Sequence, residues 1–191
     1  MMQEIRFHGR GGQGTVVASI LLAKALFKAG YFVQTFPFFG VERRGAPVET
    51  YLRFGKNKIM LRSNVYEPDV VVVQDRGLLS RVDVAKGLKK NGYLLLNSSQ
   101  GPDLSPSFSC FQVARVDANR IAWDFGLGSR THPIINTAMV GAFAKIIGLP
   151  SIKMIEEVIA LEISNQTAEN VRAAITAYQE VQPVQPNRTN V

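Results

Sequence analysis

Apolar and polar positions alternate along the first two thirds of the chain in short runs that predict strands and helices in turn. The stretch "EIRFH" (4–8) predicts a first strand, and residues 31–36 predict a second. The run "DVVVVQD" (69–75) is continuous and β-branched, which indicates a central parallel strand covered on both faces. Residues 93–97 and 111–116 complete the set of predicted parallel strands.

Longer segments have the periodicity of helices. The first, 15–29, has its polar positions at Ser19, Lys24 and Lys28, which predicts a helix that is buried except for a narrow wet stripe. Further helices are predicted over 78–90, 118–126, 134–147, 152–163 and 168–180.

Two short segments, 48–54 and 59–62, flank the turn "GKNK" and predict a β-hairpin, since the first arm alternates with period two. Together these elements indicate an α/β fold: a doubly wound, mostly parallel, Rossmann-like sheet with an inserted β-hairpin and a helical C-terminal part. Residues 1–181 are expected to form a single domain. Residues 182–191 carry turn signals without apolar periodicity, which predicts a flexible C-terminal tail.

The composition narrows the class of protein. With 191 residues, 46% of them hydrophobic and 19% charged, the chain can bury a full core. The net charge of +7 favours anionic ligands or acidic partners, but the basic residues form no arm or stripe, so we expect no nucleic-acid partner. The sequence has no uninterrupted apolar run of bilayer length and no apolar h-region at its start, so we expect no membrane association and a cytoplasmic location.

Cysteine and histidine are scarce, which excludes two kinds of site. The single Cys110 cannot hold an iron–sulfur cluster, which needs several thiolates. His8 and His132 are the only histidines, so a structural zinc site is excluded as well. Cys110 has no basic neighbour in the sequence, which favours a strand or core thiol over a nucleophile.

The stretch "FHGRGGQGT" (7–15) carries Gly9, Gly11 and Gly14 with the spacing G-x-G-x-x-G between a predicted strand and a predicted helix. This context favours a phosphate-binding loop, whose N–H groups would point outward at the positive end of the helix dipole. A tight turn that lets the helix pack close to the strand has the same signature, and the motif alone does not distinguish the two.

The residues beyond the loop argue against two common phosphate sites. Thr15 and Val16 stand where a Walker A loop requires Lys and Ser/Thr. An NAD-binding unit needs an acidic residue about 20 positions beyond the loop, but none occurs before Glu42, and Arg43 and Arg44 follow it. A ligand with several phosphates, one of them recognised by arginine, fits these residues better.

The segment "FPFFGVERRGAPVETYLRFG" (36–55) places Phe36, Phe38 and Phe39 in a predicted loop beside a charged cluster. Exposed aromatic residues mixed with arginine are typical of an interface. A local mini-core beneath a solvated charge cluster explains the phenylalanines equally well. For the paired arginines we favour a functional position, because they lie in a loop that glycine and proline constrain.

Taken together, "GRGGQGT", "FGVERRGAP" and "NTAMVGA" resemble the gamma subunits of 2-oxoacid:ferredoxin oxidoreductases, of the pyruvate or 2-oxoisovalerate type. The likeness runs from the first strand through the helix at 134–147. Val41 stands where this family has proline. The resemblance implies oxidative decarboxylation of a 2-oxoacid with coenzyme A to an acyl-CoA, with reduction of ferredoxin.

The resemblance also implies a division of labour among subunits. Thiamine diphosphate, magnesium and iron–sulfur clusters would lie on alpha, beta and delta-type partner subunits, separate or fused, and the isolated chain would be inactive. This chain would help to bind coenzyme A and would contact the partners. Carried over position by position, the residues at the ligand are Gly9, Arg10, Gly11, Gly12, Gln13, Gly14, Thr15, Arg43, Arg44, Asn136 and Thr137.

Other interpretations remain open at this point. Asn136 and Thr137 serve equally well as hydrogen-bonding groups inside a buried helix. Asp75, Ser98 and Ser99 follow predicted strands, at the edge where open α/β sheets bind ligands, and are expected as wall residues. A stand-alone oxidoreductase with an FAD- or NADP-type ligand and a scaffold subunit that binds no ligand are the two alternative functions.

Overall fold

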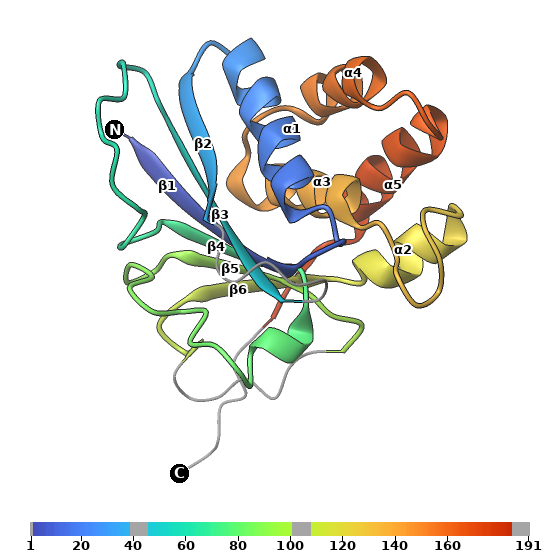
Figure 1. The fold of residues 1–191 in the computed structure, drawn as a ribbon, viewed down its shortest axis with the longest axis horizontal. Helices are drawn as coiled ribbons and strands as arrows, with labels where there is room; N and C mark the ends of the chain where they lie inside the picture. Colours follow the sequence, from blue (N-terminus) through green and yellow to red (C-terminus); the bar gives the residue numbers. More distant parts are fainter. Residues whose placement is uncertain (1, 39–45, 101–107, 185–191) are drawn as a thin grey trace.

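A computed structural model describes residues 2–38, 46–100 and 108–184 of the protein, which form an α/β fold (Figure 1). A seven-stranded mixed sheet has the order β2-β3-β1-β4-β5-β6-β7. The central strands β1, β4, β5 and β6 are parallel, whereas β3 is antiparallel to both β1 and β2. The strands are β1 (Gln3–Arg10), β2 (Phe32–Phe38), β3 (Pro47–Gly55), β4 (Val70–Val73), β5 (Tyr93–Asn97), β6 (Gln112–Val116) and β7 (Gln182–Pro183). The predicted α/β class with a mostly parallel sheet is confirmed.

The helices gather on one face of the sheet (Figure 1). They pack against β1, β3 and β4 through one apolar cluster that includes Ile5, Leu22, Leu52 and Phe143. A smaller cluster around Val71 covers the other face of the central strands. The helices are α1 (Thr15–Lys28), α2 (Ala118–Asp124), α3 (Asn136–Ile147), α4 (Ile152–Glu162) and α5 (Thr167–Glu180), with a short 3-10 helix η1 (Arg76–Leu78).

The predicted hairpin is wrong in its second arm. Residues 59–62 form no strand, and β3 pairs instead with β2 on one side and with β1 on the other. Side chains of the sheet donate hydrogen bonds to backbone carbonyls of this segment and of the residues that follow it. Gln34 donates to the Leu61 carbonyl, and Arg53 donates to the carbonyls of Ser63 and Asn64. The hairpin of the fold is therefore β2–β3.

The helix predicted over 78–90 is also wrong, because this segment forms η1 followed by turns. Gly87 has a φ of 73°, which a helix does not allow, and a Cβ there would lie 2.0 Å from the Tyr66 carbonyl oxygen. The buried Arg6 guanidinium donates to the carbonyls of Val84 and Lys86, so these groups serve the sheet instead of a helical ladder.

Smaller corrections concern single residues. Ser19 does not lie on a wet stripe of α1 but is fully buried, and the outer side of the helix instead exposes Val17, Ile20 and Phe27. Cys110 is exposed, not a core or strand thiol, and precedes β6 in a turn. The predicted tail begins with β7, which pairs with β6, while 185–191 lie outside the described residues.

Candidate functional site

The glycine loop connects β1 to α1 at the carboxyl edge of the sheet. Gly14 (φ 74°) precedes the helix in a left-handed conformation, and a Cβ on it would lie 2.9 Å from Asn136 Nδ2. A Cβ on Gly9 would lie 2.0 Å from Thr15 Oγ1. Both glycines are therefore required by close packing of the loop against its neighbours, which is the structural role that the sequence left open.

Hydrogen bonds inside the loop use several of its backbone groups. The Gly11 N–H donates to the Ala46 carbonyl, and the Gln13 N–H donates to the Arg10 carbonyl, both at 3.1 Å. The Gln13 side-chain oxygen accepts in turn from the Arg10 N–H at 2.8 Å. The Gly11 and Gln13 N–H groups are therefore not among the free N–H groups that the loop could offer to a phosphate. Gly12 (φ 97°) has no atom of the described residues within 4 Å of its Cβ position, so that position is open on the described side.

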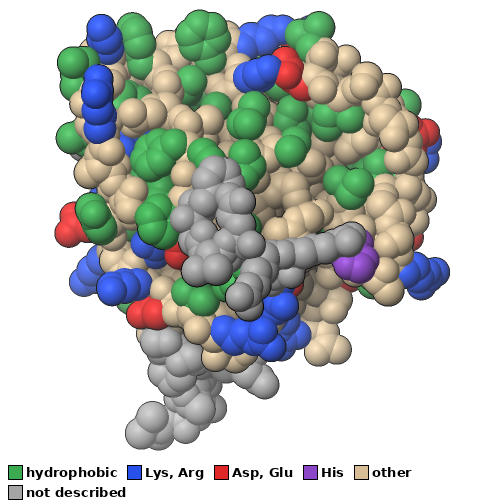
Figure 2. Space-filling view, in the orientation of Figure 1, with side chains coloured by type: hydrophobic (Ala, Val, Ile, Leu, Met, Phe, Trp, Pro, Cys, Tyr) green, Lys and Arg blue, Asp and Glu red, His purple; other side chains and the backbone are tan. Residues whose placement is uncertain are grey.

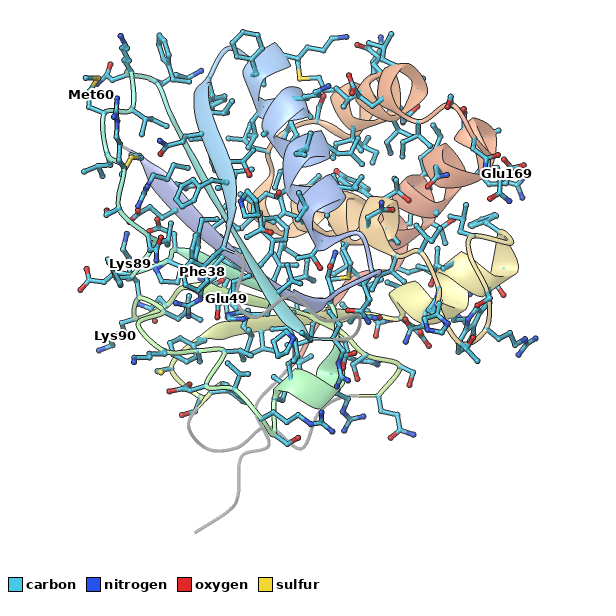
Figure 3. All side chains as sticks on the ribbon, viewed as in Figure 1. Phe38, Glu49, Met60, Lys89, Lys90 and Glu169 are labelled. Carbon is cyan, nitrogen blue, oxygen red and sulfur yellow. The ribbon has the colours of Figure 1, made fainter. Side chains whose placement is uncertain are left out.

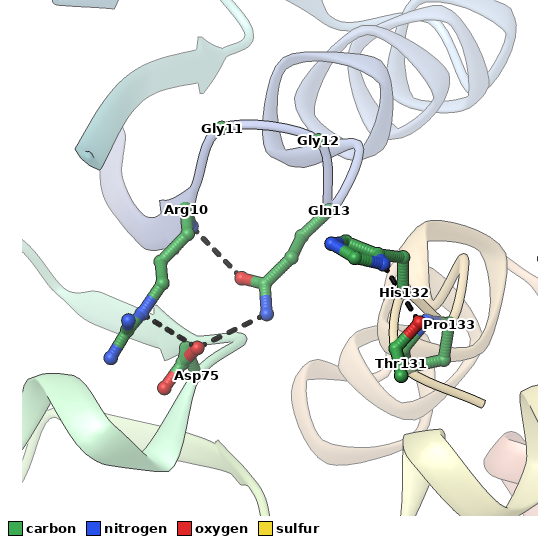
Figure 4. Close-up of a pocket in the computed structure, with 8 residues that line it drawn as sticks. All are labelled: Arg10, Gly11, Gly12, Gln13, Asp75, Thr131, His132 and Pro133. Atoms are coloured by element: carbon green, nitrogen blue, oxygen red, sulfur yellow. Dashed lines mark hydrogen bonds and ion pairs between the residues drawn. The ribbon is translucent and has the colours of Figure 1, made fainter. Parts of the chain in front are cut away.

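Arg10, Gln13 and Asp75 form a polar network below the loop (Figure 4). Arg10 Nε lies 2.8 Å from Asp75 Oδ2, at an angle that makes the contact an ion pair and not a directed hydrogen bond. Gln13 Nε2 donates to the same carboxylate at 3.2 Å. Asp75 Oδ1 accepts from the Gly77 N–H and so caps η1. One carboxylate therefore positions both the arginine and the glutamine.

A buried pair supports the start of α1. Thr15 Oγ1 donates to Gln74 Oε1 at 2.6 Å, and Asn97 Nδ2 donates to the Gln74 carbonyl at 2.9 Å. Gln74 is fully buried, and among the described residues its Nε2 has no hydrogen-bond partner. The Thr15 hydrogen bond therefore joins the start of α1 to the end of β4, and its role is structural.

The loop and the network line one side of a cavity of about 320 Å³. Arg10, Gly11, Gly12 and Gln13 come from the glycine loop, and Asp75 follows β4. The opposite wall comes from the segment between α2 and α3 and consists of Thr131, His132 and Pro133. Figure 4 shows the two walls facing each other across the cavity.

Sequence reasoning found Asp75 by topology but missed the opposite wall. The available signal was the stretch "GSRTHP", which combines turn residues with one of only two histidines. The other expected wall residues do not line this cavity. Ser98 is buried and donates to the Gln100 carbonyl, and Ser99 accepts from Arg115.

The remaining candidates from the sequence lie at different depths. Asn136 opens α3 beside Gly14, and its side-chain oxygen accepts from the Thr137 N–H. Thr137 is fully buried and donates to Asn170 on α5, so it joins two helices. Arg43 and Arg44 lie outside the described residues. Their described neighbour Ala46 contacts the glycine loop through Gly11.

A second polar cluster lies on the other face of β1 and β3. Arg6 Nε donates to His8 Nε2 at 3.0 Å, and His8 Nδ1 lies 3.6 Å from Glu49. Burial lowers the pKa of His8 to about 4, with Glu49 opposing the shift and Arg6 adding to it. Burial also raises the pKa of Tyr51, whose hydroxyl donates to Glu49. His8 is therefore neutral at physiological pH and belongs to the sheet, not to the cavity.

The predicted aromatic loop is partly a strand. Phe36 and Phe38 belong to β2, and both rings contact the ring of Tyr51 on β3, at centroid distances of 5.4 and 6.2 Å. Phe36 is half-buried, whereas 47% of Phe38 is exposed. Phe39 lies outside the described residues. We call Phe36, Phe38 and Tyr51 the aromatic edge (Figure 3 labels Phe38).

Two further findings apply to the described residues. No helix there is both long enough and apolar enough to span a bilayer. Nor do the described residues bring three or more His, Cys, Asp or Glu side chains together as a metal site.

Comparisons with known proteins agree on one family. The family model described as pyruvate ferredoxin/flavodoxin oxidoreductase matches residues 4–180. Pyruvate synthase subunit PorC from Methanocaldococcus jannaschii is 49% identical, over 94% of this chain and 97% of the relative. The pyruvate/ketoisovalerate oxidoreductases common subunit gamma from Pyrococcus furiosus is 46% identical, over 95% of this chain and 98% of the relative.

Solved structures show the same fold. The pyruvate oxidoreductase subunit PORC from Thermotoga maritima matches with a TM-score of 0.81 and 36% identity, over 95% of this chain and 98% of that chain. A 2-oxoglutarate:ferredoxin oxidoreductase from Magnetococcus marinus, solved with coenzyme A bound, matches with a TM-score of 0.74 over 34% of its own chain. Its 18% identity shows the fold alone. The resemblance found in the sequence is confirmed, and the chain belongs to the pyruvate ferredoxin/flavodoxin oxidoreductase family as a gamma-type subunit.

Proposed function

We propose that this chain is the coenzyme A-binding gamma subunit of an oxidoreductase that converts pyruvate or a branched-chain 2-oxoacid to an acyl-CoA and reduces ferredoxin. The names of its relatives support the reaction: pyruvate synthase in one case, pyruvate and ketoisovalerate oxidoreductases in another. Membership of this family also decides against the stand-alone FAD- or NADP-type enzyme. The scaffold that binds no ligand remains the interpretation to be tested.

The observation that carries the proposal is the cavity between the glycine loop and the segment between α2 and α3. A volume of about 320 Å³ lies at the lower end of small-molecule sites, so the cavity has room for only part of coenzyme A. The described residues that line it contribute backbone, amide, hydroxyl, imidazole and charged groups, and Pro133 is the one apolar side chain among them. We assign it to the phosphate-bearing end, which leaves the pantetheine thiol to reach the partner subunits.

Among the described residues that line the cavity, Arg10 is the arginine, and its ion pair with Asp75 already orients it. Asp75 holds the guanidinium in place before a ligand arrives, so little conformational entropy is lost when a phosphate binds. Arg43 and Arg44 are proposed as further phosphate ligands or interface residues. Their described neighbour Ala46 supports this placement, because it is hydrogen-bonded to Gly11.

The chemistry that this chain lacks is assigned to partners. One cysteine in the whole sequence cannot hold an iron–sulfur cluster. We therefore propose that thiamine diphosphate, magnesium and the clusters lie on alpha, beta and delta-type subunits, in a cytoplasmic complex. Bound, these groups supply carbanion stabilisation and electron transfer. The residues of this chain bind and orient coenzyme A.

A matched pair of glycine variants tests the proposal. Gly12 (φ 97°) and Gly30 (φ 80°) both have a positive φ, and no atom in the described part of the chain lies within 4 Å of either Cβ position. Gly12→Val and Gly30→Val therefore introduce similar backbone strain, but only Gly12 lines the cavity, and Gly30 lies at the far end of α1.

In the assembled complex, Gly12→Val should raise the KM for coenzyme A by roughly ten-fold to about 150-fold. This range corresponds to the loss of one charge-assisted hydrogen bond of about 1.5–3 kcal/mol. The half-reaction with the 2-oxoacid should be unaffected, and Gly30→Val should leave this KM within about two-fold. A correctly assembled Gly12→Val complex with an unchanged KM would mean that the glycine loop is a packing turn in a scaffold subunit.

A further inference from the structure

We propose that His132, oriented by Thr131, binds a phosphate group of the same ligand from the wall opposite the glycine loop. The inference rests on the proposed function of the cavity and adds a binding residue that the family motifs did not indicate. It begins with the position of the ring. Figure 4 shows the His132 imidazole extending across the cavity toward Gln13, with both residues lining the same space.

The backbone around His132 is held firmly for a surface loop. The His132 N–H donates to the Ser129 carbonyl, and the Ser129 N–H donates to the His132 carbonyl, both at 3.1 Å. A bridge between Gly128 and Pro133 closes the turn. Gly128 is required there, because its φ is 79° and a Cβ would lie 2.4 Å from the His132 carbonyl oxygen. A rigid wall of this kind presents its side chain at low entropic cost.

A short chain of hydroxyl groups orients the ring. His132 Nδ1 lies 3.0 Å from Thr131 Oγ1, which lies 3.2 Å from Ser129 Oγ. In the tautomer that this role requires, the Thr131 hydroxyl donates to Nδ1, so that Nε2 carries the hydrogen and can donate it to a phosphate oxygen. The arrangement is the usual one for functional histidines, in which the partner of one nitrogen sets the orientation and tautomer of the other.

The charges on the first wall explain why a phosphate would need a further binding group on the opposite wall. Arg10 and Asp75 both line the cavity and form an ion pair, so the carboxylate offsets much of the attraction of the arginine for a phosphate. Among the described residues that line the cavity, His132 is the remaining ionisable group, and it lies away from that ion pair (Figure 4). The neighbouring Arg130 is directed elsewhere, over the ring of Trp123.

The two histidines of the chain make a direct test possible. His132 is exposed in the cavity wall, whereas His8 is buried in the sheet and serves as an internal reference. In the full chain labelled with ¹⁵N and ¹³C, coenzyme A and inorganic pyrophosphate should both shift the His132 ring signals and the Gly12 amide signal. Pantetheine, which has no phosphate, should shift neither, and the His8 signals should not move.

Two variants on the same loop separate contact from general electrostatics. His132→Ala should weaken coenzyme A binding to the full chain about ten-fold, the expected loss for one hydrogen bond to a charged group. The KM for coenzyme A in the assembled complex should rise by a similar factor. Arg130→Ala removes a positive charge two residues before His132, from a side chain that does not line the cavity, and should change either value less than two-fold.

The outcomes distinguish this inference from the proposed function. If the Gly12 signal shifts while the His132 signals do not, the ligand binds the loop alone, and only the role of His132 is overturned. If His132→Ala binds coenzyme A as tightly as the unsubstituted chain, or Arg130→Ala weakens it equally, the role of His132 is likewise overturned. If neither signal shifts and the KM is insensitive to both His132→Ala and Gly12→Val, the cavity does not bind coenzyme A and both proposals fail.

Discussion

The cavity at the glycine loop and the aromatic edge differ in how many of their side chains find partners within this chain. Arg10, Gln13 and Asp75 contact one another around the cavity through two hydrogen bonds and an ion pair, so its shape is set before any ligand arrives. The aromatic edge packs on buried side chains, but 47% of Phe38 remains exposed to water. Figure 2 shows hydrophobic side chains spread over this part of the surface, around β2 and α1.

This difference indicates two kinds of recognition. A preorganised polar cavity suits a small charged ligand, because the cost of ordering has been met during folding. Exposed aromatic residues on a well-packed base suit a protein partner, which would remove them from water. The four predictions below test this comparison, from the largest expected effect to the smallest.

The largest effect should come from Arg53, which supports the aromatic edge from below. Only 1% of its side chain is exposed, and it forms an ion pair with Glu4 and donates to the carbonyls of Ser63 and Asn64. Arg53→Leu would leave these acceptors without a donor, so the free energy of unfolding should fall by about 3–5 kcal/mol. Urea denaturation of the full chain measures it.

Arg10 provides the control at the cavity. Its side chain is 28% exposed, and its ion pair with Asp75 is screened by solvent, so Arg10→Leu should cost about 1 kcal/mol or less. Equal losses for the two variants would show that the base of the aromatic edge is no more rigidly built than the cavity.

The next effect concerns His8, which also lies beneath the aromatic edge. Among the described residues, Arg6 and Glu49 are the ionisable groups in contact with it. The pKa of about 4 in the folded chain lies below the ordinary value of 6.5, so the unfolded chain binds more protons between these values. Stability should therefore be fully present above about pH 6.5 and should fall as the pH approaches 4.

A pKa difference of this size corresponds to a loss of up to about 3 kcal/mol at the acid end. The measurement is the free energy of unfolding at several pH values between 4 and 7, for the unsubstituted chain and for His8→Gln. The difference in stability between the two chains should shrink as the pH falls. A constant difference across this range would show that His8 does not titrate with a lowered pKa.

The sequence predicted the frame of both regions but not their details, for physical reasons that particular residues show. Strand and helix periodicity located β1, α1, β4 and α3, because an element that is buried on one face needs apolar residues at regular spacing. The second arm of the hairpin and the helix over 78–90 failed for another reason. The buried side chains of Arg53 and Arg6 donate hydrogen bonds to backbone carbonyls in or next to these segments. Such long-range contacts leave no pattern in the local sequence.

The same contrast between local sequence patterns and long-range contacts applies to the site. The glycine spacing identified the loop, since Gly14 has a positive φ that few other residues adopt. The stretch "GSRTHP" indicated a turn with a histidine but not its place in the site, because that depends on how the segment after α2 lies across the carboxyl edge of the sheet. Asp75 was within reach of topology, since it follows a central parallel strand.

A third prediction compares two glutamines, one in each region. Gln13→Glu would place a carboxylate beside Asp75 and facing the cavity, so the KM for coenzyme A should rise about ten-fold in the assembled complex. Gln34→Glu adds the same charge beside Arg53, below the aromatic edge, and should leave this KM within two-fold. A similar rise for both variants would mean that only the net charge of the chain matters.

The smallest effect should come from Phe38, and it should appear in assembly and not in folding. Phe38 is 47% exposed, so Phe38→Ser should lower the free energy of unfolding of the isolated chain by less than about 1 kcal/mol. If a partner subunit covers the aromatic edge, the same change should weaken assembly about three-fold to ten-fold, measured by titrating the chain into the partner subunits. Phe27→Ser, at a residue 68% exposed on α1, is the matched control and should leave assembly unchanged. Equal effects of the two variants on assembly would show that the aromatic edge has no special role in the interface.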